Sequence, residues 1–124
     1  MIFLEGQASL RHPAGPCGAE FLCSAVARGV ILQHAPDRDH FHSMDHLPFQ
    51  PPSLEEEIEL IRLYGSRVLA LSLNGGSLGE IDLFRIRDEL ASKFNLPVIC
   101  PLEEGVKELL PVVQSFLKKE RGGA

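Results

Sequence analysis

Acidic and imidazole side chains occupy two places in the chain where their types and spacing could support chemistry. The first is Glu5, which follows the apolar run 1–4 and precedes Gly6. A carboxylate at the carboxyl end of a buried parallel strand faces the crevice in which α/β proteins bind their ligands. Glu5 is therefore a candidate functional residue. The alternative is an ordinary turn, in which Glu5 caps a loop and Gly6 only allows the chain to bend.

The second place is a stretch of thirteen residues that is dense in possible metal ligands: His34, Asp37, Asp39, His40, His42, Asp45 and His46. Zinc sites hold their ligands on rigid elements at short recurrent spacings, and no HxxxH helix or cysteine pair accompanies these residues. We favour a different interpretation, in which His34, with Arg38 or His40 just beyond it, faces the same crevice as Glu5 and contacts an anionic ligand. A solvated loop is the remaining alternative.

A third segment, Asn74-Gly75-Gly76-Ser77, lies between an expected strand and an expected helix. Glycines at such a position can let backbone N–H groups approach a ligand at the helix N-terminus. A plain strand-to-helix turn is the simpler explanation of the same residues. The sequence contains no GxxxxGK[ST] loop, so it does not predict triphosphate binding in the P-loop manner.

The elements that must position these residues follow an alternating strand and helix rhythm. Apolar, β-branched runs predict four strands, at 1–4, 29–33, 67–73 and 97–100. Parallel neighbours need a crossover of a dozen or more residues, and the spacings provide it. The expected fold class is therefore α/β, with a mostly parallel sheet of about four strands and helices on both faces.

Four helices are expected, and they are signalled in different ways. Ser53 and Glu56 form a capping-box pattern that starts a helix, and Asn95 closes an amphipathic helix over 80–94. A third helix is expected over 106–119, where Pro111 should kink or split it. A small-residue-rich helix is expected over 17–28, with Pro16 near its first turn. The stretch 35–52 should be a long irregular loop, which in compact domains is often functional.

Composition limits the classes of function. The 124 residues fit one domain, 1–124, and 44% apolar with 23% charged residues is typical of a globular protein. A net charge of −5 argues against nucleic-acid binding, and no apolar run approaches the roughly 18 residues of a membrane span. The sequence does not start like a secretory signal, so the expected location is the cytoplasm. The cysteines there would be reduced, and we expect them to be small buried side chains: Cys17, Cys23 and Cys100.

With these residues in place, the chain resembles the carboxyl-terminal half of the P-loop-like domain of the D-glutamate N-acetyltransferase family, long catalogued as a domain of unknown function. The landmarks occur in the family's order: 5–10 with His12-Pro13, Gln33-His34 followed by 36–38, 52–56, 71–74, and 96–98 with Pro101. The resemblance implies half of a P-loop NTPase-like fold, similar to dethiobiotin synthetase and to the synthetase domains of cobyric acid amidases.

The resemblance also implies roles for individual residues. Glu5 would bind magnesium or substrate, and His34 or Glu5 would be the catalytic base for acetyl transfer from acetyl-CoA to a small amino acid. Substrate contacts would come from Gln7, Ser9, His12, Arg38 and His40, and Asn74 would contact the cofactor. Nucleotide is not expected, because the phosphate loop is missing.

The chain departs from the family pattern because it starts at the strand that ends in Glu5, without the preceding phosphate loop and its helix. We therefore expect it to be inactive alone, and we expect an open sheet edge to be covered by a second copy or a partner chain. The competing hypothesis is a non-enzymatic α/β module that binds a partner chain or a small anion.

Overall fold

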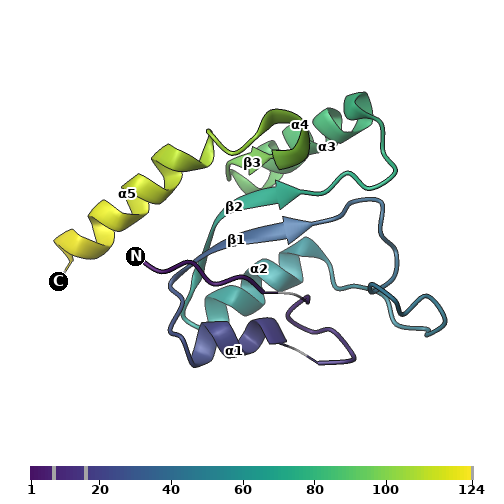
Figure 1. Ribbon diagram of the computed structural model, residues 1–124, viewed down its shortest axis with the longest axis horizontal. Helices are drawn as coiled ribbons and strands as arrows, with labels where there is room; N and C mark the ends of the chain where they lie inside the picture. Colours follow the sequence, from purple (N-terminus) through teal and green to yellow (C-terminus); the bar gives the residue numbers. More distant parts are fainter. Residues whose placement is uncertain (7, 16, 124) are drawn as a thin grey trace. The chain divides into compact units, whose positions relative to one another are not determined.

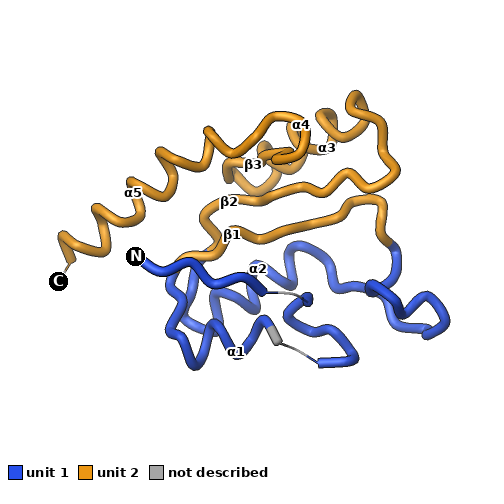
Figure 2. The backbone as a smooth tube through the Cα atoms, in the orientation of Figure 1, with its two compact units in different colours: residues 1–28, 39–67 blue, residues 29–38, 68–124 orange. Residues whose placement is uncertain are grey.

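The computed structural model describes residues 1–6, 8–15 and 17–123, with the side chain of Cys17 left out. The chain forms two compact units, each assembled from two separate stretches of sequence (Figure 2). Unit 1 comprises Met1–Arg28 and Asp39–Arg67, and unit 2 comprises Gly29–Arg38 and Val68–Ala124. The expectation of a single domain over 1–124 stays a prediction.

Unit 2 contains the three-stranded sheet of the structure (Figure 1). Its strands, in the order β1-β2-β3, are β1 (Gly29–His34), β2 (Arg67–Leu73) and β3 (Val98–Ile99). The arrows of β1 and β2 point the same way in Figure 1, and β2 pairs with β3 in parallel with Leu71 opposite Val98. The predicted α/β class with a parallel sheet is confirmed.

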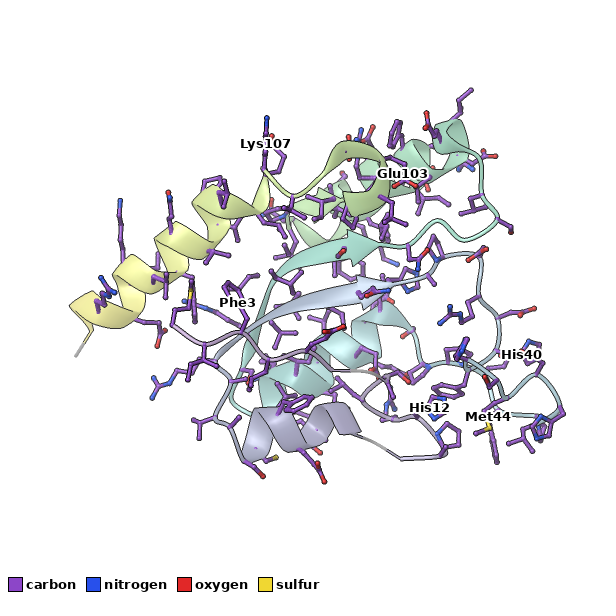
Figure 3. The ribbon with its side chains drawn as sticks, viewed as in Figure 1. Phe3, His12, His40, Met44, Glu103 and Lys107 are labelled. Carbon is purple, nitrogen blue, oxygen red and sulfur yellow. The ribbon has the colours of Figure 1, made fainter. Side chains whose placement is uncertain are left out.

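The prediction of a fourth strand at 1–4 is wrong, since the structure assigns no strand there and the described sheet has three strands. Met1, Ile2 and Phe3 are exposed, by 74%, 85% and 70%, and Figure 3 labels Phe3. An apolar run becomes a strand only where a neighbouring strand supplies the hydrogen-bonding ladder. The amino-acid pattern shows that residues 1–4 are apolar, but it does not show whether a neighbouring strand lies beside them.

Helix α3 (Glu80–Phe94) packs against β3 and closes the core of unit 2. Its Leu83 meets Leu73 of β2 and Cys100 after β3, and all three are almost completely buried. Burying an aliphatic side chain of this size contributes about 1.5–3 kcal/mol. The helix ends as predicted, because Asn95 adopts the left-handed conformation, with φ at 50°, that stops a helix.

The carboxyl-terminal part of unit 2 differs from the expectation at Pro111. A short helix, α4 (Pro101–Glu104), follows β3, and α5 (Leu109–Gly122) starts later than predicted. Pro111 is the third residue of α5, where a backbone N–H has no intrahelical acceptor, so the proline neither kinks nor splits the helix. β3 is shorter than the predicted 97–100 because Cys100 already caps α4.

Unit 1 contains two helices, α1 (Cys17–Cys23) and α2 (Leu54–Leu63). The predicted capping box is confirmed: the Glu56 N–H donates to Ser53 Oγ, and the Ser53 N–H donates to Glu56 Oε2, both at 3.3 Å. The predicted helix over 17–28 is too long, because Val26 is left-handed, with φ at 53°, beyond the end of α1. The expected start at Pro16 lies outside the described residues.

The stretch 35–52 has no helix or strand, as predicted for a long irregular loop. Within the residues that the structure describes, no helix has the length and apolar character needed to cross a membrane.

Candidate functional site

Three of the predicted site residues belong to unit 2 and follow the carboxyl ends of neighbouring strands. His34 is the last residue of β1, and Asn74 comes directly after β2. The Asn74 N–H donates a hydrogen bond of 2.9 Å to the backbone oxygen of His34. The two strand ends are therefore held side by side at the edge of the sheet where α/β proteins bind ligands.

His34 is partly buried, and this burial lowers the pKa of its imidazole. Desolvation disfavours the charged form of a histidine, so the imidazole of His34 is neutral near pH 7. A neutral imidazole carries a lone pair and can accept a proton. The geometry thus supplies a group with the protonation state that a general base requires.

The segment after β2 forms a closed turn. The Gly76 N–H donates to Asn74 Oδ1 at 3.1 Å, and the Leu78 N–H donates to the backbone oxygen of Gly75 at 2.9 Å. A Cβ on Gly75 would lie 2.9 Å from the buried Leu83 side chain, so close helix packing accounts for this glycine. These hydrogen bonds are those of a strand-to-helix turn, the simpler of the two interpretations of this segment.

Asp37 occupies a position that the sequence did not assign to this site. Its Oδ2 accepts hydrogen bonds from the N–H of Ser77, at 2.8 Å, and from Ser77 Oγ, at 3.0 Å. These two donors hold the pKa of the Asp37 carboxyl below its usual range, and the charge of Arg38 adds to the effect. The missed signal was the occurrence of a Pro-Asp turn after one strand and a Gly-Gly-Ser turn after the neighbouring strand.

The other predicted site residues belong to unit 1. Glu5 and Ser9 are exposed outside helices and strands, and the Ser9 backbone oxygen accepts from the N–H of His12 at 3.1 Å. Gln7 lies outside the described residues. His40 is half-buried, and its Nδ1 lies 2.7 Å from Asp39 Oδ1.

The imidazole of His12 is engaged at both ring nitrogens within unit 1. Its Nδ1 accepts from the Ala14 N–H at 3.1 Å, and its Nε2 donates to the His42 backbone oxygen at 3.3 Å. The ring also meets Phe41 edge to face, with the centroids 5.4 Å apart. Figure 3 shows His12 and His40 on the loops of this unit. His12 therefore has a structural function in the loop, and its predicted substrate contact stays a prediction.

In the described parts of the chain, no group of three or more His, Cys, Asp or Glu side chains is placed to hold a metal ion. The seven imidazole and carboxylate residues of the sequence motif thus do not converge. Glu5 as a magnesium ligand stays a prediction, since Mg²⁺ is often held by one or two carboxylates together with water and substrate oxygens.

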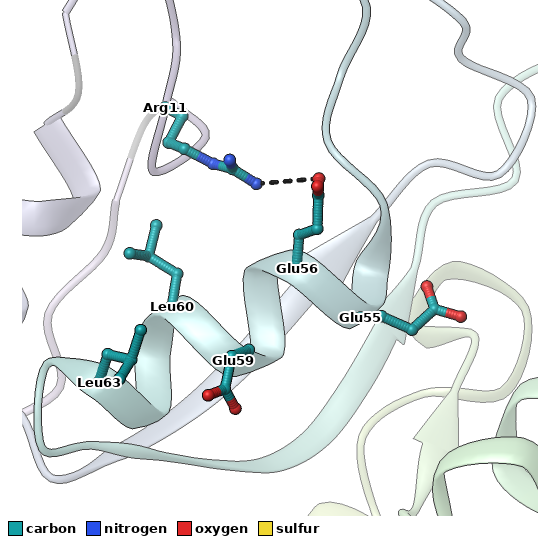
Figure 4. Close-up of a pocket in the computed structure, with 6 residues that line it drawn as sticks. All are labelled: Arg11, Glu55, Glu56, Glu59, Leu60 and Leu63. Carbon is teal, nitrogen blue, oxygen red and sulfur yellow. Dashed lines mark hydrogen bonds and ion pairs between the residues drawn. The ribbon is translucent and has the colours of Figure 1, made fainter.

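An open pocket of about 410 Å³ lies on unit 1 beside α2 (Figure 4). It is lined by Arg11, Glu55, Glu56, Glu59, Leu60 and Leu63. Two of its charged groups bind each other, with Arg11 Nη2 3.3 Å from Glu56 Oε2 (Figure 4), and Glu59 pairs with Arg62 of the same helix at 2.6 Å. Arg11 also lies 2.9 Å from the buried Glu57. The contacts of Arg11 with Glu56 and Glu57 therefore hold α2 against the segment before α1.

The parallel α/β sheet, with strand ends that meet at His34 and Asn74, is consistent with a P-loop-like domain. The chain belongs to the family described as "Domain of unknown function (DUF1611_C) P-loop domain", whose model matches residues 1–110. This agrees with the resemblance to a P-loop-like domain of unknown function that the sequence landmarks indicate.

The chain is also similar to the crystal structure of a DUF1611 family protein from Anabaena variabilis ATCC 29413. The TM-score is 0.76 with 23% sequence identity, over 90% of this chain and 34% of that chain. The similarity concerns the fold, and the present chain spans about a third of the length of that protein. No curated protein matches the chain.

Proposed function

We propose that this chain forms the acceptor-binding part of an enzyme that acetylates the amino group of a small acidic amino acid such as D-glutamate. The observation that carries the proposal is the partly buried His34 at the carboxyl end of β1, where burial lowers the pKa of the imidazole. The resemblance of the sequence landmarks to D-glutamate N-acetyltransferases supports the substrate class. Family membership supports the P-loop-like fold.

In this proposal, His34 receives the proton that the acceptor ammonium must lose before the amine can attack an acyl group. Arg38 is exposed and is the last residue of the turn that begins at Ala35. Its guanidinium binds the acceptor carboxylate. Ser9, Gln7, His12 and His40 remain proposed acceptor contacts. Glu5 would hold Mg²⁺ through its carboxylate, with water completing the coordination.

The acetyl donor fits the described residues less well than the acceptor. Asn74 Oδ1 and the N–H groups of Gly76 and Ser77 are already engaged in hydrogen bonds within the chain. They are therefore not available to contact acetyl-CoA in this arrangement, and we assign no step of the reaction to Asn74. In this proposal the present chain binds the acceptor, and residues outside this chain bind acetyl-CoA.

Calorimetric titration of the chain with D-glutamate, and separately with acetyl-CoA in the presence of Mg²⁺, tests the proposal. We expect D-glutamate to bind and acetyl-CoA not to bind. Replacing Arg38 by Met should weaken D-glutamate binding about tenfold, the loss of roughly one charge-assisted contact. His46→Gln, at an exposed histidine outside the proposed site, is the control that should leave binding unchanged. Absence of D-glutamate binding, or equal binding by the Arg38 variant, would contradict the proposal.

A second candidate function is a module that binds another protein chain. The observation that favours it is the exposure of the apolar residues 1–4 in unit 1. We expect such a surface to cause self-association, which light scattering after size exclusion measures. Ile2→Glu combined with Phe3→Glu should then restore a monomer. A monomeric wild type that binds D-glutamate would favour the enzymatic proposal over this one.

A further inference from the structure

The turn after β1 brings Asp37 and Arg38 to fixed places in unit 2. It comprises Ala35, Pro36, Asp37 and Arg38, and the Arg38 N–H donates to the Ala35 oxygen at 3.1 Å. Proline at the second position is preorganised for such a turn, because its ring fixes the backbone angle φ. Asp37 is the third residue of the turn, directly before Arg38.

The carboxylate of Asp37 ties this turn to the turn after β2. Both the N–H and the hydroxyl of Ser77 donate to Asp37 Oδ2, at 2.8 and 3.0 Å. One residue earlier, the backbone of Gly76 comes so close that a Cβ there would lie 2.3 Å from Asp37 Oδ2. Gly76 also has a φ of 57°, which disfavours any residue with a side chain. Asp37, Gly76 and Ser77 thus fit together in one arrangement, which we call the Asp37 clasp.

Arg38 gains its position from this clasp. Among the described residues, no hydrogen bond or salt bridge engages its guanidinium, so nothing at the far end of the side chain fixes it. The backbone of Arg38 is held by the turn on one side and through Asp37 on the other. The contact between Asp37 and Ser77 joins the same two strand ends as the hydrogen bond from the Asn74 N–H to the His34 backbone oxygen.

We propose that Asp37 is a positioning residue, which holds the turn after β1 against Ser77 so that Arg38 presents its guanidinium to the carboxylate of the acceptor. Asp37 does not touch the acceptor itself. Its carboxylate accepts hydrogen bonds from Ser77, and the guanidinium of Arg38 binds the acceptor carboxylate. This inference rests on the proposed function for the identity of the acceptor, but the clasp has consequences of its own.

Four variants separate positioning from a general loss of structure. Asp37→Asn weakens the acceptor of both Ser77 donors, and Gly76→Ala displaces Asp37 without changing any charged or hydrogen-bonding side chain. Ser77→Thr keeps the hydroxyl and the N–H and should behave as the wild type. Asp82→Asn is the matched control, since Asp82 is an exposed aspartate of the same unit whose contact with Arg85 is 3.3 Å long.

The first measurement is D-glutamate affinity by calorimetry. We expect Asp37→Asn and Gly76→Ala to bind about tenfold more weakly than wild type, with Ser77→Thr and Asp82→Asn close to it. The second measurement is backbone order from ¹⁵N relaxation, with far-UV circular dichroism to verify folding. The amides of 35–38 should lose order in Asp37→Asn and Gly76→Ala, while those of β2 and α3 keep it.

The two measurements distinguish failure of the clasp from failure of the proposed function. If wild type does not bind D-glutamate but 35–38 still lose order in both variants, the proposed acceptor is wrong and Asp37 still positions Arg38. If 35–38 keep their order in Asp37→Asn, or if D-glutamate binds equally to wild type and both variants, the positioning role of Asp37 is overturned.

Discussion

Arg11 Nε donates a hydrogen bond of 2.9 Å to Glu57 Oε1, joining the segment before α1 to the buried side of α2. Glu57 is 8% exposed, and the interaction with this carboxylate raises the pKa of Arg11. A buried carboxylate is tolerated when a cation and hydrogen bonds compensate for its lost hydration. The pair is therefore important for the stability of unit 1, mainly because loss of Arg11 would leave the buried carboxylate of Glu57 without a charged partner.

Replacing Arg11 by Met tests this relationship. Removing the arginine should lower the free energy of unfolding by about 1–3 kcal/mol, because Glu57 loses its charged partner while remaining buried. Urea denaturation followed by circular dichroism measures the change. The control is Arg62→Met, whose partner Glu59 is exposed on the same helix, and which should change the free energy of unfolding far less than Arg11→Met because water screens an exposed pair. Equal losses in the two variants would show that Glu57 needs no partner.

The buried contact between α3 and the sheet makes a second prediction. Leu83→Ala should destabilise the protein by about 2.5–5 kcal/mol, because it opens a cavity against Leu73 and Cys100. The matched control is Leu102→Ala on α4, where the leucine is 79% exposed and the change should stay within about 0.5 kcal/mol. Thermal or urea denaturation provides both values. A small effect at Leu83 would contradict the core described for unit 2.

Acidification should destabilise the protein through His34. Burial lowers the pKa of His34 in the folded state, so below the ordinary histidine pKa the unfolded chain binds more protons than the folded chain. The contribution of neutral His34 is complete above about pH 6.5 and is lost as the pH falls through the lower folded-state pKa. The free energy of unfolding, measured by urea titration at several pH values, should show this dependence in wild type.

His34→Gln should flatten the same dependence, because glutamine carries no titrating group. NMR titration of the imidazole protons provides the pKa of His34 directly and should give a value below the ordinary histidine pKa. An equal or higher pKa at His34 would remove the basis for its role as a base.

The proposed catalytic pair has a direct test in an acetyl-transfer assay with D-glutamate and acetyl-CoA, performed on this chain together with whatever chain completes the donor site. The double variant Glu5→Ala with His34→Ala should lose at least about a hundredfold in kcat, the typical contribution of a general base. Release of free CoA thiol measures the rate. Unchanged activity would eliminate both residues from the catalytic machinery.

The sequence predicted those parts of the fold that depend on local signals. The Ser53 capping box and the left-handed Asn95 are read from a few adjacent residues, and both helix ends lie where these residues placed them. The run 67–73 likewise coincides with β2. Pro111 was misjudged because its effect depends on its distance from the helix start, which the apolar pattern placed three residues too early.

The features that the sequence did not reveal depend on contacts between distant residues. Strand pairing for 1–4 cannot be read from apolarity, because it requires a neighbour. The Asp37 clasp joins residues forty positions apart, so the local surroundings of Asp37 and of Ser77 did not reveal that the two residues bind each other. His34 and Asn74 were found because both follow strands, and parallel strands bring their carboxyl ends to one edge. The chemistry at that edge, including the neutral imidazole, follows from burial that only the folded chain shows.

The interleaved composition of the two units constrains the order in which the chain can fold as it leaves the ribosome. Unit 1 is complete only after Arg67 has been synthesised, although its first stretch ends at Arg28. Strand β1 emerges earlier than β2, its neighbour in the sheet, and waits for more than thirty residues of translation before it can pair with β2. An apolar strand that waits in this way is open to wrong pairings, so the rate of translation across the loop 35–52 should influence the yield of native protein.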